Sequence, residues 1–331
     1  MTKNLHFSAS IGVLACSSLL LSACASGGSA SADSENSCDL DTVRVLVSSQ
    51  PGSPIDSMAR EMASALQSTG FEPSVVIETR TGGSGAVALS ALVGGPADGS
   101  TLYAMARSEV LLFSSGELHK FGPDALDYLI RLQDDPYAWV VRADSKFKTL
   151  EDLISYAEDN PGAINVGGFG TASAHHLAAL QIAKQSGIDI AWIPFDGGSA
   201  AVTALLGGHI DVANTNPGPV LEQVRAGELR ILGVASEERL PGLAETPTFK
   251  DSGTDFVSSH WRGLVAKAGM PAACKEMLED ALTDAYETDS FQQFLEEQNV
   301  LPGYMPSEEF EPYVLQVIDD SKALLNEVGL G

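Results

Sequence analysis

The sequence predicts an α/β protein built of two lobes with a ligand cleft between them. Short runs of β-branched residues alternate with segments of helical periodicity along most of the 331 residues, which is typical of sheets covered by helices. The 308 residues from Cys24 to the end are enough for two lobes with separate cores. The middle block reads as a complete set of βαβ units, so the first and last blocks are expected to combine into the other lobe.

The first lobe is expected to comprise residues 40–142 and 255–331. Its helix over residues 54–68 follows from apolar side chains spaced for one buried face: Ile55, Met58, Ala59, Met62 and Leu66. Asp98-Gly99 predicts a turn before a strand. The expected strands are 42–48, 73–78, 101–106, 137–142 and 261–266, and the other expected helices are 82–93, 271–299 and 307–328.

The second lobe is expected to comprise residues 143–254. Thr149 with Asp152 three residues later predicts a capping box that opens its first helix. The remaining pattern alternates strand and helix, as parallel sheets require. The expected strands are 164–167, 190–195, 210–214 and 230–235, and the expected helices are 173–186, 199–206 and 219–226.

The N-terminus reads as an export signal that ends at a lipid-accepting cysteine. Lys3 supplies the positive charge, residues 11–21 are apolar but too short to span a bilayer, and Leu21-Ser22-Ala23-Cys24 resembles the lipobox of bacterial lipoproteins. The signal is therefore residues 1–23, and residues 24–39 form a flexible tether lipidated at Cys24. The expected location is extracytoplasmic, on the periplasmic or outer-surface side of the cell membrane. An ordinary signal peptide with a chance cysteine is the alternative.

The charge of the chain excludes some partners. Nineteen Lys and Arg against 44 Asp and Glu give a net charge of −25. Such a surface disfavours nucleic acid and anionic lipid as partners. An anionic ligand would need attraction from local backbone dipoles or from a local cation.

Two strand-to-helix turns are the candidate binding elements. Turn 1, residues 48–56, contains Gly52 for a tight bend and Pro54 for a first helical turn. Turn 2, residues 167–173, is glycine-rich and precedes another helix. Each helix start presents unpaired N–H groups that suit an anion. A glycine-rich turn is commonly only a turn, but two of them facing one cleft favour a binding site.

Several motifs recur in the order and spacing of one family. They are Pro51, Gly52, Asp56, Ala59 and Arg60 in and after turn 1; residues 77–85; residues 98–102; Gly167, Gly170, Ser173, His176 and Leu177; residues 193–197; and residues 261–271. From about residue 43 to its end, the chain resembles the extracytoplasmic solute receptors of tripartite tricarboxylate transporters, the Bug receptors. It departs from their pattern at Ser48, Ser53, Gly168 and Ala172, where the family pattern has proline, glycine, serine and glycine.

The resemblance implies a type II periplasmic-binding-protein fold and a receptor without catalysis, cofactor or metal. It would pass a small carboxylate to the membrane subunits of a tripartite tricarboxylate-type transporter. Backbone amides of both turns would hold the carboxylate, and Asp56 would orient water or its own loop. The implied binding residues are Ser49, Gln50, Gly52, Ser53, Pro54, Ile55, Asp56, Gly168, Phe169, Gly170, Thr171, Ala172, Ser173, His176, Phe195, Asp196 and Asn214.

Other readings of the same residues were weighed. The turn 2 glycines resemble a dinucleotide fingerprint, but Asp189 precedes the next strand instead of closing it. His175 and His176 are adjacent and point apart on a helix, which disfavours a shared metal. Ser84 lies in a sequence that fails the last position of a nucleophile elbow. An exported hydrolytic enzyme or a non-transport carboxylate sensor using the same cleft remains the alternative.

Two cysteines remain once Cys16 leaves with the signal and Cys24 is lipidated. Cys38 precedes the first strand, at the sheet end away from the cleft. If the strand over 261–266 returns in the opposite direction, Cys274 falls at the same end. A disulfide between them is therefore expected outside the cytoplasm, and two unpaired cysteines are the alternative.

Overall fold

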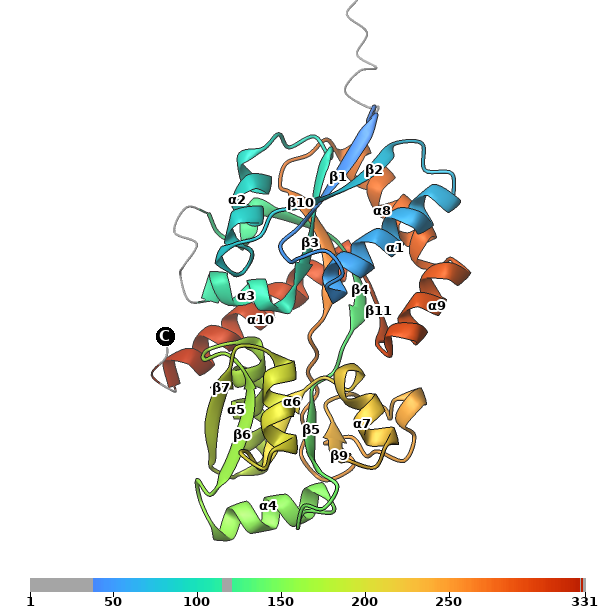
Figure 1. Cartoon of the computed structure of the whole chain (residues 1–331). Helices are drawn as coiled ribbons and strands as arrows, with labels where there is room; N and C mark the ends of the chain where they lie inside the picture. The colour runs from blue at the N-terminus through green and yellow to red at the C-terminus, as the bar shows by residue number, and fades with distance from the viewer. Residues whose placement is uncertain (1–37, 115–120, 328, 330–331) are drawn as a thin grey trace, which may run out of the picture. The chain divides into compact units, whose positions relative to one another are not determined.

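The computed structural model describes residues 38–114, 121–327 and 329, and these form two sheets (Figure 1). In spatial order the first sheet contains β11 (Leu301–Pro306), β4 (Leu126–Asp134), β10 (Arg262–Lys267), β3 (Thr101–Ala106), β1 (Thr42–Val47) and β2 (Ser74–Thr79). The second contains β7 (Ile190–Phe195), β6 (Ile164–Phe169), β8 (Val212–Thr215), β5 (Ala138–Arg142) and β9 (Leu229–Val234). The expected signal, Cys24 and the tether up to residue 37 lie outside the described residues.

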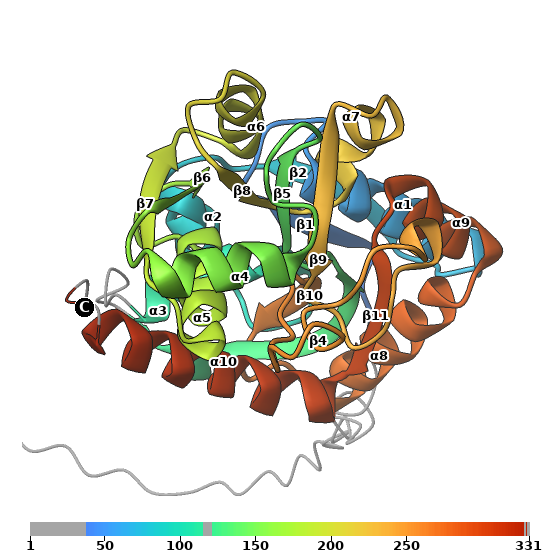
Figure 2. The same ribbon diagram turned by 90° about the horizontal axis from the view of Figure 1, so that it is seen from below.

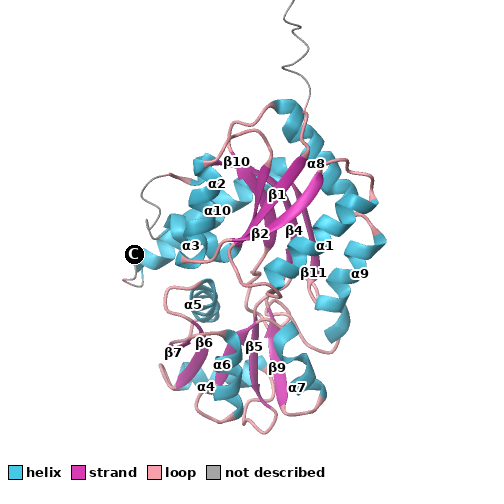
Figure 3. Cartoon of the chain, turned by 45° about the horizontal axis from the view of Figure 1, so that its top comes forward, coloured by secondary structure: helices cyan, strands magenta, loops and turns pink. Residues whose placement is uncertain are grey.

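The first sheet is mixed and is covered on both faces. β1, β2 and β3 are parallel, whereas β10 runs antiparallel to β3 and to β4. One apolar cluster packs one face against α1 (Pro54–Ser68), α8 (Ala272–Tyr286) and α9 (Asp289–Gln298). Another packs the opposite face against α2 (Ala86–Gly94), α3 (Arg107–Ser114) and α10 (Ser307–Glu327). The two helix groups flank the strands in Figure 3.

The second sheet is arranged in the same way. β6 is parallel to β7 and β8, and β5 is antiparallel to β8 and β9. The helices α4 (Leu150–Asp159) and α5 (Ala174–Ser186) pack on one face, and α6 (Gly198–Leu206) and α7 (Leu221–Arg225) on the other (Figure 2). The predicted capping box is present at α4, where Thr149 and Asp152 exchange hydrogen bonds with each other's backbone amides. Each sheet therefore has its own core.

The structure corrects four sequence predictions. Residues 138–142 form β5, which pairs with β8 and β9, so this strand belongs to the second sheet and not to the first lobe. The expected helix over 219–226 is a 3-10 turn, η4 (Gly218–Val220), followed by the single short turn of α7. The expected helix over 271–299 is broken between α8 and α9, where Thr288 caps the second helix. β4, β11 and α3 were not predicted.

Two chain crossings connect the sheets, and they pair with each other. We call residues 135–137 and 257–261 the hinge. Pro136 and Ser259 form an isolated antiparallel bridge. The Tyr137 N–H donates to the Ser258 carbonyl at 3.2 Å, and the His260 N–H donates to the Asp135 carbonyl at 2.8 Å. The two crossings therefore form a short ladder.

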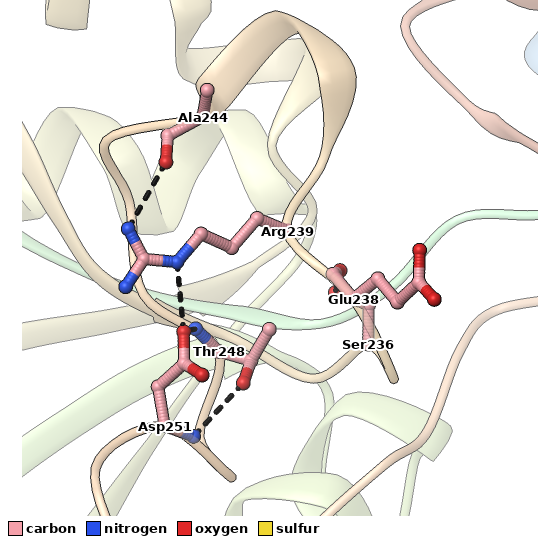
Figure 4. A network of polar contacts seen from close by, with 6 residues as sticks. All are labelled: Ser236, Glu238, Arg239, Ala244, Thr248 and Asp251. Atoms are coloured by element: carbon pink, nitrogen blue, oxygen red, sulfur yellow. Dashed lines mark hydrogen bonds and ion pairs between the residues drawn. The ribbon is translucent and has the colours of Figure 1, made fainter.

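The segment that leads from β9 back to the hinge is fixed by polar contacts (Figure 4). Arg239 donates to an Asp251 carboxylate oxygen at 2.8 Å and to the Ala244 carbonyl at 3.1 Å. The Asp251 N–H donates to the Thr248 hydroxyl at 3.0 Å. The ion pair of Arg239 and Asp251 is exposed, so it organises this long connection more than it stabilises the fold.

A disulfide joins Cys38 to Cys274, with the Cα atoms 4.7 Å apart. It lies at the end of the first sheet away from the hinge, because β10 runs antiparallel to β3 and ends opposite the start of that strand. Cys274 is in the first turn of α8, and its Cβ lies close to Gly99, just before β3. None of the helices in the described part of the chain is both long and apolar enough to cross a membrane.

Candidate functional site

Strand directions bring turn 1 and turn 2 to the hinge. In the first sheet, Arg262 at the start of β10 pairs with Ala106 at the end of β3, and β1 runs parallel to β3. In the second sheet, Thr215 at the end of β8 pairs with Ala138 at the start of β5, and β6 runs parallel to β8. The carboxyl ends of β1, β3, β6 and β8 therefore all face the hinge, where ligands of α/β sheets usually bind.

Turn 1 is held by the buried carboxylate of Asp56. The Gly52 N–H donates to Asp56 Oδ2 at 2.8 Å, and the Arg60 guanidinium donates to both carboxylate oxygens at 2.9 and 3.0 Å. The Arg60 hydrogen bond is the largest of the effects that lower the pKa of Asp56. An ionised carboxylate that already serves the loop is not a general base. Asp56 therefore orients turn 1.

Turn 1 leaves one amide of the helix start free. The Ser53 N–H donates to the Gln50 carbonyl at 3.1 Å, and the Asp56 N–H donates to the Ser53 hydroxyl at 3.4 Å. Pro54 has no N–H. Among the described residues, the Ile55 N–H has no hydrogen-bond partner. It is therefore the donor that turn 1 offers from residues 53–56.

Turn 2 is braced from three sides. The Gly170 N–H donates to the Phe195 carbonyl at 2.9 Å, and the Trp192 ring N–H donates to the Gly170 carbonyl at 3.0 Å. The Ala172 N–H donates to Nδ1 of His176 at 3.0 Å. The Ser173 hydroxyl caps α5, accepting from the His176 N–H at 3.0 Å. The backbone of turn 2 is therefore fixed by its own lobe.

The same bonds decide which amides of turn 2 are available. Those of Gly170 and Ala172 are used inside the protein, whereas those of Thr171 and Ser173 have no partner among the described residues. The free amides are therefore only part of the backbone amides of both turns that the resemblance implies. A carboxylate grip by Ile55, Thr171 and Ser173 stays a prediction.

The structure places the other predicted site residues around these turns. Asn214 is fully buried and donates to the His175 carbonyl at 2.7 Å, so it ties β8 to the start of α5. His176 is buried and stacks on Trp192, with ring centroids 4.7 Å apart. Exposed members of the predicted set are Gln50, Gly52, Pro54, Phe169, Thr171 and Asp196; half-buried ones are Ser49, Ser53, Gly170, Ala172, Ser173 and Phe195; and Ile55 and Gly168 are buried.

A cavity of about 180 Å³ lies beside turn 1 and contains residues that the sequence reasoning missed. Its walls come from turn 1, from the end of β3 and the first turn of α3, and from the hinge and the start of β10. The lining residues are Ser48, Ser49, Ser53, Pro54, Ile55, Ala106, Ser108, Glu109, His260 and Arg262. Arg262 is the single charged residue in the apolar run 261–266, which was the available signal. Pro54 and Arg262 also line a neighbouring cavity of about 310 Å³, whose opposite wall includes Gly218 and Pro219.

Glu109 connects this cavity to turn 1. One of its oxygens accepts from the Ser48 hydroxyl at 3.3 Å and from the Tyr103 hydroxyl at 3.1 Å. The other accepts from the Ala106 N–H at 2.8 Å and from the Ser108 hydroxyl at 3.1 Å. Burial raises the pKa of Glu109, although these hydrogen bonds act to lower it. Glu109 thus fixes the end of β1 to the end of β3.

The hinge is tied to α3 and to the residue that follows β8 by polar side chains. Arg107 donates to the Ser259 carbonyl at 3.1 Å and to the Ser258 hydroxyl. Asn216, after β8, donates to the Asp135 carbonyl at 2.7 Å. Its amide oxygen lies 3.2 Å from Nε2 of His175, at the start of α5. Burial lowers the pKa of His175 to about 4. Polar contacts therefore connect the hinge to the first turn of α3 and, through Asn216, to the first turn of α5.

No three His, Cys, Asp or Glu side chains come together as a metal site within residues 38–114 and 121–327. A larger cavity of about 470 Å³ lies between α7 and β11, but no residue of either turn lines it. The strand ends at the hinge combine free backbone donors with a buried cation. They are the better candidate for a small anion.

Comparison with known proteins agrees with this fold. Residues 58–330 match the model of the tripartite tricarboxylate transporter family receptor. A protein of Cupriavidus necator, named for its place in the gbd 5' region, is 29% identical over 290 residues, which is 87% of this chain and 88% of that protein. Protein BugT of Bordetella pertussis is 26% identical over 291 residues, which is 87% and 89% of the two chains.

Solved structures show the same architecture. A TctC solute binding protein from Polaromonas superposes with a TM-score of 0.78 at 27% identity, covering 86% of this chain and 98% of that one. A Rhodopseudomonas palustris protein with bound malate gives a TM-score of 0.68 at 23% identity, covering 86% and 98%. Another R. palustris protein, with adipate, gives 0.72 at 24%, covering 87% and 97%.

These matches confirm the two-lobed periplasmic-binding-protein fold predicted from the sequence. They also confirm the expectation of a binding protein instead of an enzyme, because the family and its solved members are solute-binding receptors. The family model covers most of the chain, including turn 2, and begins two residues after the end of turn 1. The chain belongs to the tripartite tricarboxylate transporter receptor family.

Proposed function

We propose that this protein is a lipid-anchored extracytoplasmic receptor that captures a small carboxylate at the hinge between its lobes. It then delivers the ligand to the membrane subunits of a tripartite tricarboxylate-type transporter. The observation that carries the proposal is the meeting of two strand-end turns from different sheets, each with free amides, at one hinge.

The ligand class follows from the donors. The N–H groups of Ile55, Thr171 and Ser173 suit a carboxylate, because helix starts and unpaired amides favour negative charge. The chain as a whole carries −25 and repels anions at long range, so the attraction is local. The malate and adipate held by two structural relatives are small carboxylates of this kind.

Binding without turnover is the first test. We expect malate or adipate to raise the melting temperature and to be recovered unchanged after incubation. A carboxylate panel that leaves the melting temperature of the full mature protein unaltered would contradict the proposal.

Gly170→Val tests the place of binding. Gly170 has a φ of +58°, where a β-branched residue is strained, so this variant distorts turn 2. We expect its carboxylate affinity by titration calorimetry to fall at least tenfold. Gly187→Val is the matched control, because Gly187 has a φ of +70° with open space around it at the far end of α5. The control should lose stability but keep its affinity, and parental affinity in Gly170→Val would refute the site.

The lipid anchor has its own test. Cys24→Ala should leave the exported protein unlipidated, because the acyl-accepting thiol is gone, and membrane fractions should lose it. Ligand uptake should also fall in cells that carry the Cys24→Ala variant. A Cys24→Ala protein that stays in the membrane fraction would show that Cys24 is not the anchor.

A further inference from the structure

Arg262 is a buried cation whose hydrogen-bonding capacity is not used by the protein. It is 7% exposed, and its Nη1 has no hydrogen-bond partner among the described residues. Its contact with a carboxylate is long, since Nη2 lies 3.8 Å from Asp135 Oδ2. Charge-assisted pairs that hydrogen-bond are near 2.8 Å. Asp135 thus balances the charge of Arg262 but does not accept a hydrogen bond from its guanidinium.

Arg107, the other buried arginine at the hinge, is different. Its guanidinium donates to Ser258 and to the Ser259 carbonyl, so it has a structural task. Arg262 instead lines both cavities beside turn 1. A guanidinium presents a planar fork of donors that matches a carboxylate. Hydrogen bonds to the hinge therefore hold the Arg107 guanidinium, whereas the Arg262 guanidinium makes none to the described residues.

Further unsatisfied polar atoms lie in the hinge and at the strand ends that face it. Within the described residues, buried side-chain atoms without a partner include His260 Nδ1, Gln133 Oε1, Asp135 Oδ1, Tyr137 OH and Asn214 Oδ1. These residues belong to the hinge or to strand ends that face it. Buried polar groups are almost always satisfied in folded proteins, so a cluster of exceptions marks a place built for a polar molecule.

The cavity beside turn 1 has the chemistry of an anion subsite. His260 and Arg262 line it together with the hydroxyl-bearing Ser48, Ser49 and Ser53. Glu109 lines it too, but each of its oxygens already accepts two hydrogen bonds. At about 180 Å³ the cavity has room for roughly six water volumes of ~30 Å³ each, enough for a carboxylate and a short chain.

We propose that Arg262, with His260 beside it, binds a second anionic group of the ligand, so that the receptor prefers dicarboxylates to monocarboxylates of equal length. This inference rests on the proposed function, in which the free amides of the turns hold the first carboxylate. The second carboxylate enters the cavity beside turn 1 and receives the unused guanidinium donors. Arg262 is then the residue that selects ligands with two carboxylates over ligands with one.

The test compares matched acids by titration calorimetry on the full mature protein. The probes are succinate against butyrate, and adipate against hexanoate. In the pair whose dicarboxylate binds more tightly, we expect the wild type to bind the dicarboxylate about ten- to a hundredfold more tightly than the monocarboxylate of the same length. Arg262→Gln should remove that advantage and leave monocarboxylate affinity within about threefold. Arg230→Gln, at a half-buried arginine of β9 away from both turns, controls for loss of a positive charge.

The outcomes separate the possible roles of Arg262. If Arg262→Gln weakens both acids of a pair equally, Arg262 only supports the hinge and the inference is wrong. Equal affinity of the wild type for both acids also overturns it, while the proposed function stands. If none of the four acids binds, the proposed function fails first. Should Arg262→Gln not fold, because Asp135 is left as an unpaired buried charge, the double variant with Asp135→Asn leaves neither charge behind.

Discussion

Ala172 holds a backbone conformation that residues other than glycine rarely adopt. Its φ is +53°, in the left-handed region, and its N–H is the one that His176 accepts. The receptor motif that the sequence resembles has glycine at this position, and the geometry gives the reason. Here an alanine carries the strain, which costs about 1–2 kcal/mol in an L-residue.

We therefore predict that a larger side chain at residue 172 is costly. Ala172→Val should lower the free energy of unfolding by about 1–2 kcal/mol, whereas Ala172→Gly should keep at least the parental stability. Urea denaturation measures both. Ala200→Val, at an exposed position of α6, is the control and should cost about 0.5 kcal/mol through helix propensity. Equal losses in the two valine variants would refute the strain.

His176 makes turn 2 sensitive to acid. Its Nδ1 accepts the Ala172 N–H, so that nitrogen must be unprotonated. Burial lowers the pKa of His176 from 6.5 to about 4. A histidine with a depressed folded-state pKa gives stability that is complete above pH 6.5 and is lost as the pH falls toward 4. The loss from this one residue is on the order of 3 kcal/mol.

His176→Gln should flatten the fall in melting temperature between pH 6.5 and 4, because glutamine does not titrate. His175 acts in the same direction as His176, and Asp135, whose pKa burial raises to about 6, acts in the opposite direction. The comparison of parent and variant cancels both contributions. His209→Gln, at an exposed histidine, should follow the parental curve. A His176→Gln curve parallel to the parental one would contradict this assignment.

Gly168 shows how one departure from the family motif is accommodated. A Cβ at this glycine would lie 2.5 Å from the Trp192 ring and 2.9 Å from the Asn214 carbonyl. The motif places serine here, and this chain instead fills the space with the tryptophan that stacks on His176. The sequence could show the substitution but not the neighbour that requires it, because the two residues are 24 positions apart.

At the scale of elements, helices and strands with a regular apolar pattern were predicted correctly, and those with an interrupted pattern were missed. α1 begins and ends as predicted, because its apolar face and its proline at the start agree. β4 was missed because charged and polar residues, Asp127, Arg131 and Gln133, interrupt its apolar run. β11 was missed because it contains two prolines and a glycine, which a strand at the edge of a sheet tolerates.

α3 was missed for a different reason. It has only eight residues and follows β3 without a connecting loop, so no turn separates the helix from the strand in the sequence. Yet its first turn provides Arg107 and Glu109, which organise the hinge and turn 1. Because α3 was not predicted, the predicted site lacked the residues that α3 contributes to it. The backbone turns were predictable from glycine and proline, whereas this wall depends on long-range pairing of β3 with β10.

The disulfide is the element-scale feature with a direct test. It closes a loop across 236 residues of sequence, from the start of β1 to α8. Cys38→Ser with Cys274→Ser should lower the free energy of unfolding by about 2–4 kcal/mol. Carboxylate affinity should be unchanged, since the bond lies at the sheet end away from the hinge. Two free thiols in the folded, exported protein by mass spectrometry would show that no bond forms.

At the scale of the whole molecule, the alternation of strands and helices was sufficient to predict two α/β lobes. The boundary between them was placed a few residues late, because β5 begins only three residues after β4 ends. No change in composition marks that crossing. The pairing of β5 with β8 and β9 decides its membership, and such pairing is not visible in the local sequence.

We predict that the lobes close when the ligand binds. The crossings are short and the ligand donors lie on both sheets, so a bound carboxylate favours the state in which both turns reach it. Small-angle scattering should show a smaller radius of gyration with a stabilising carboxylate than without it. The Gly170→Val variant, measured at the same ligand concentration, should remain at the ligand-free value. An unchanged radius in the ligand-bound parent would rule out closure.

The pairing of the two crossings has a mechanical consequence. Backbone hydrogen bonds join Asp135 to His260 and Tyr137 to Ser258. Neither crossing can therefore bend alone without breaking these bonds. Rotation about the ladder axis keeps these bonds, whereas sliding of one lobe past the other would shear them. The protein is therefore compliant in one direction and stiff in the others. We therefore expect the predicted closure to be a rotation that keeps the bonds between the two crossings intact.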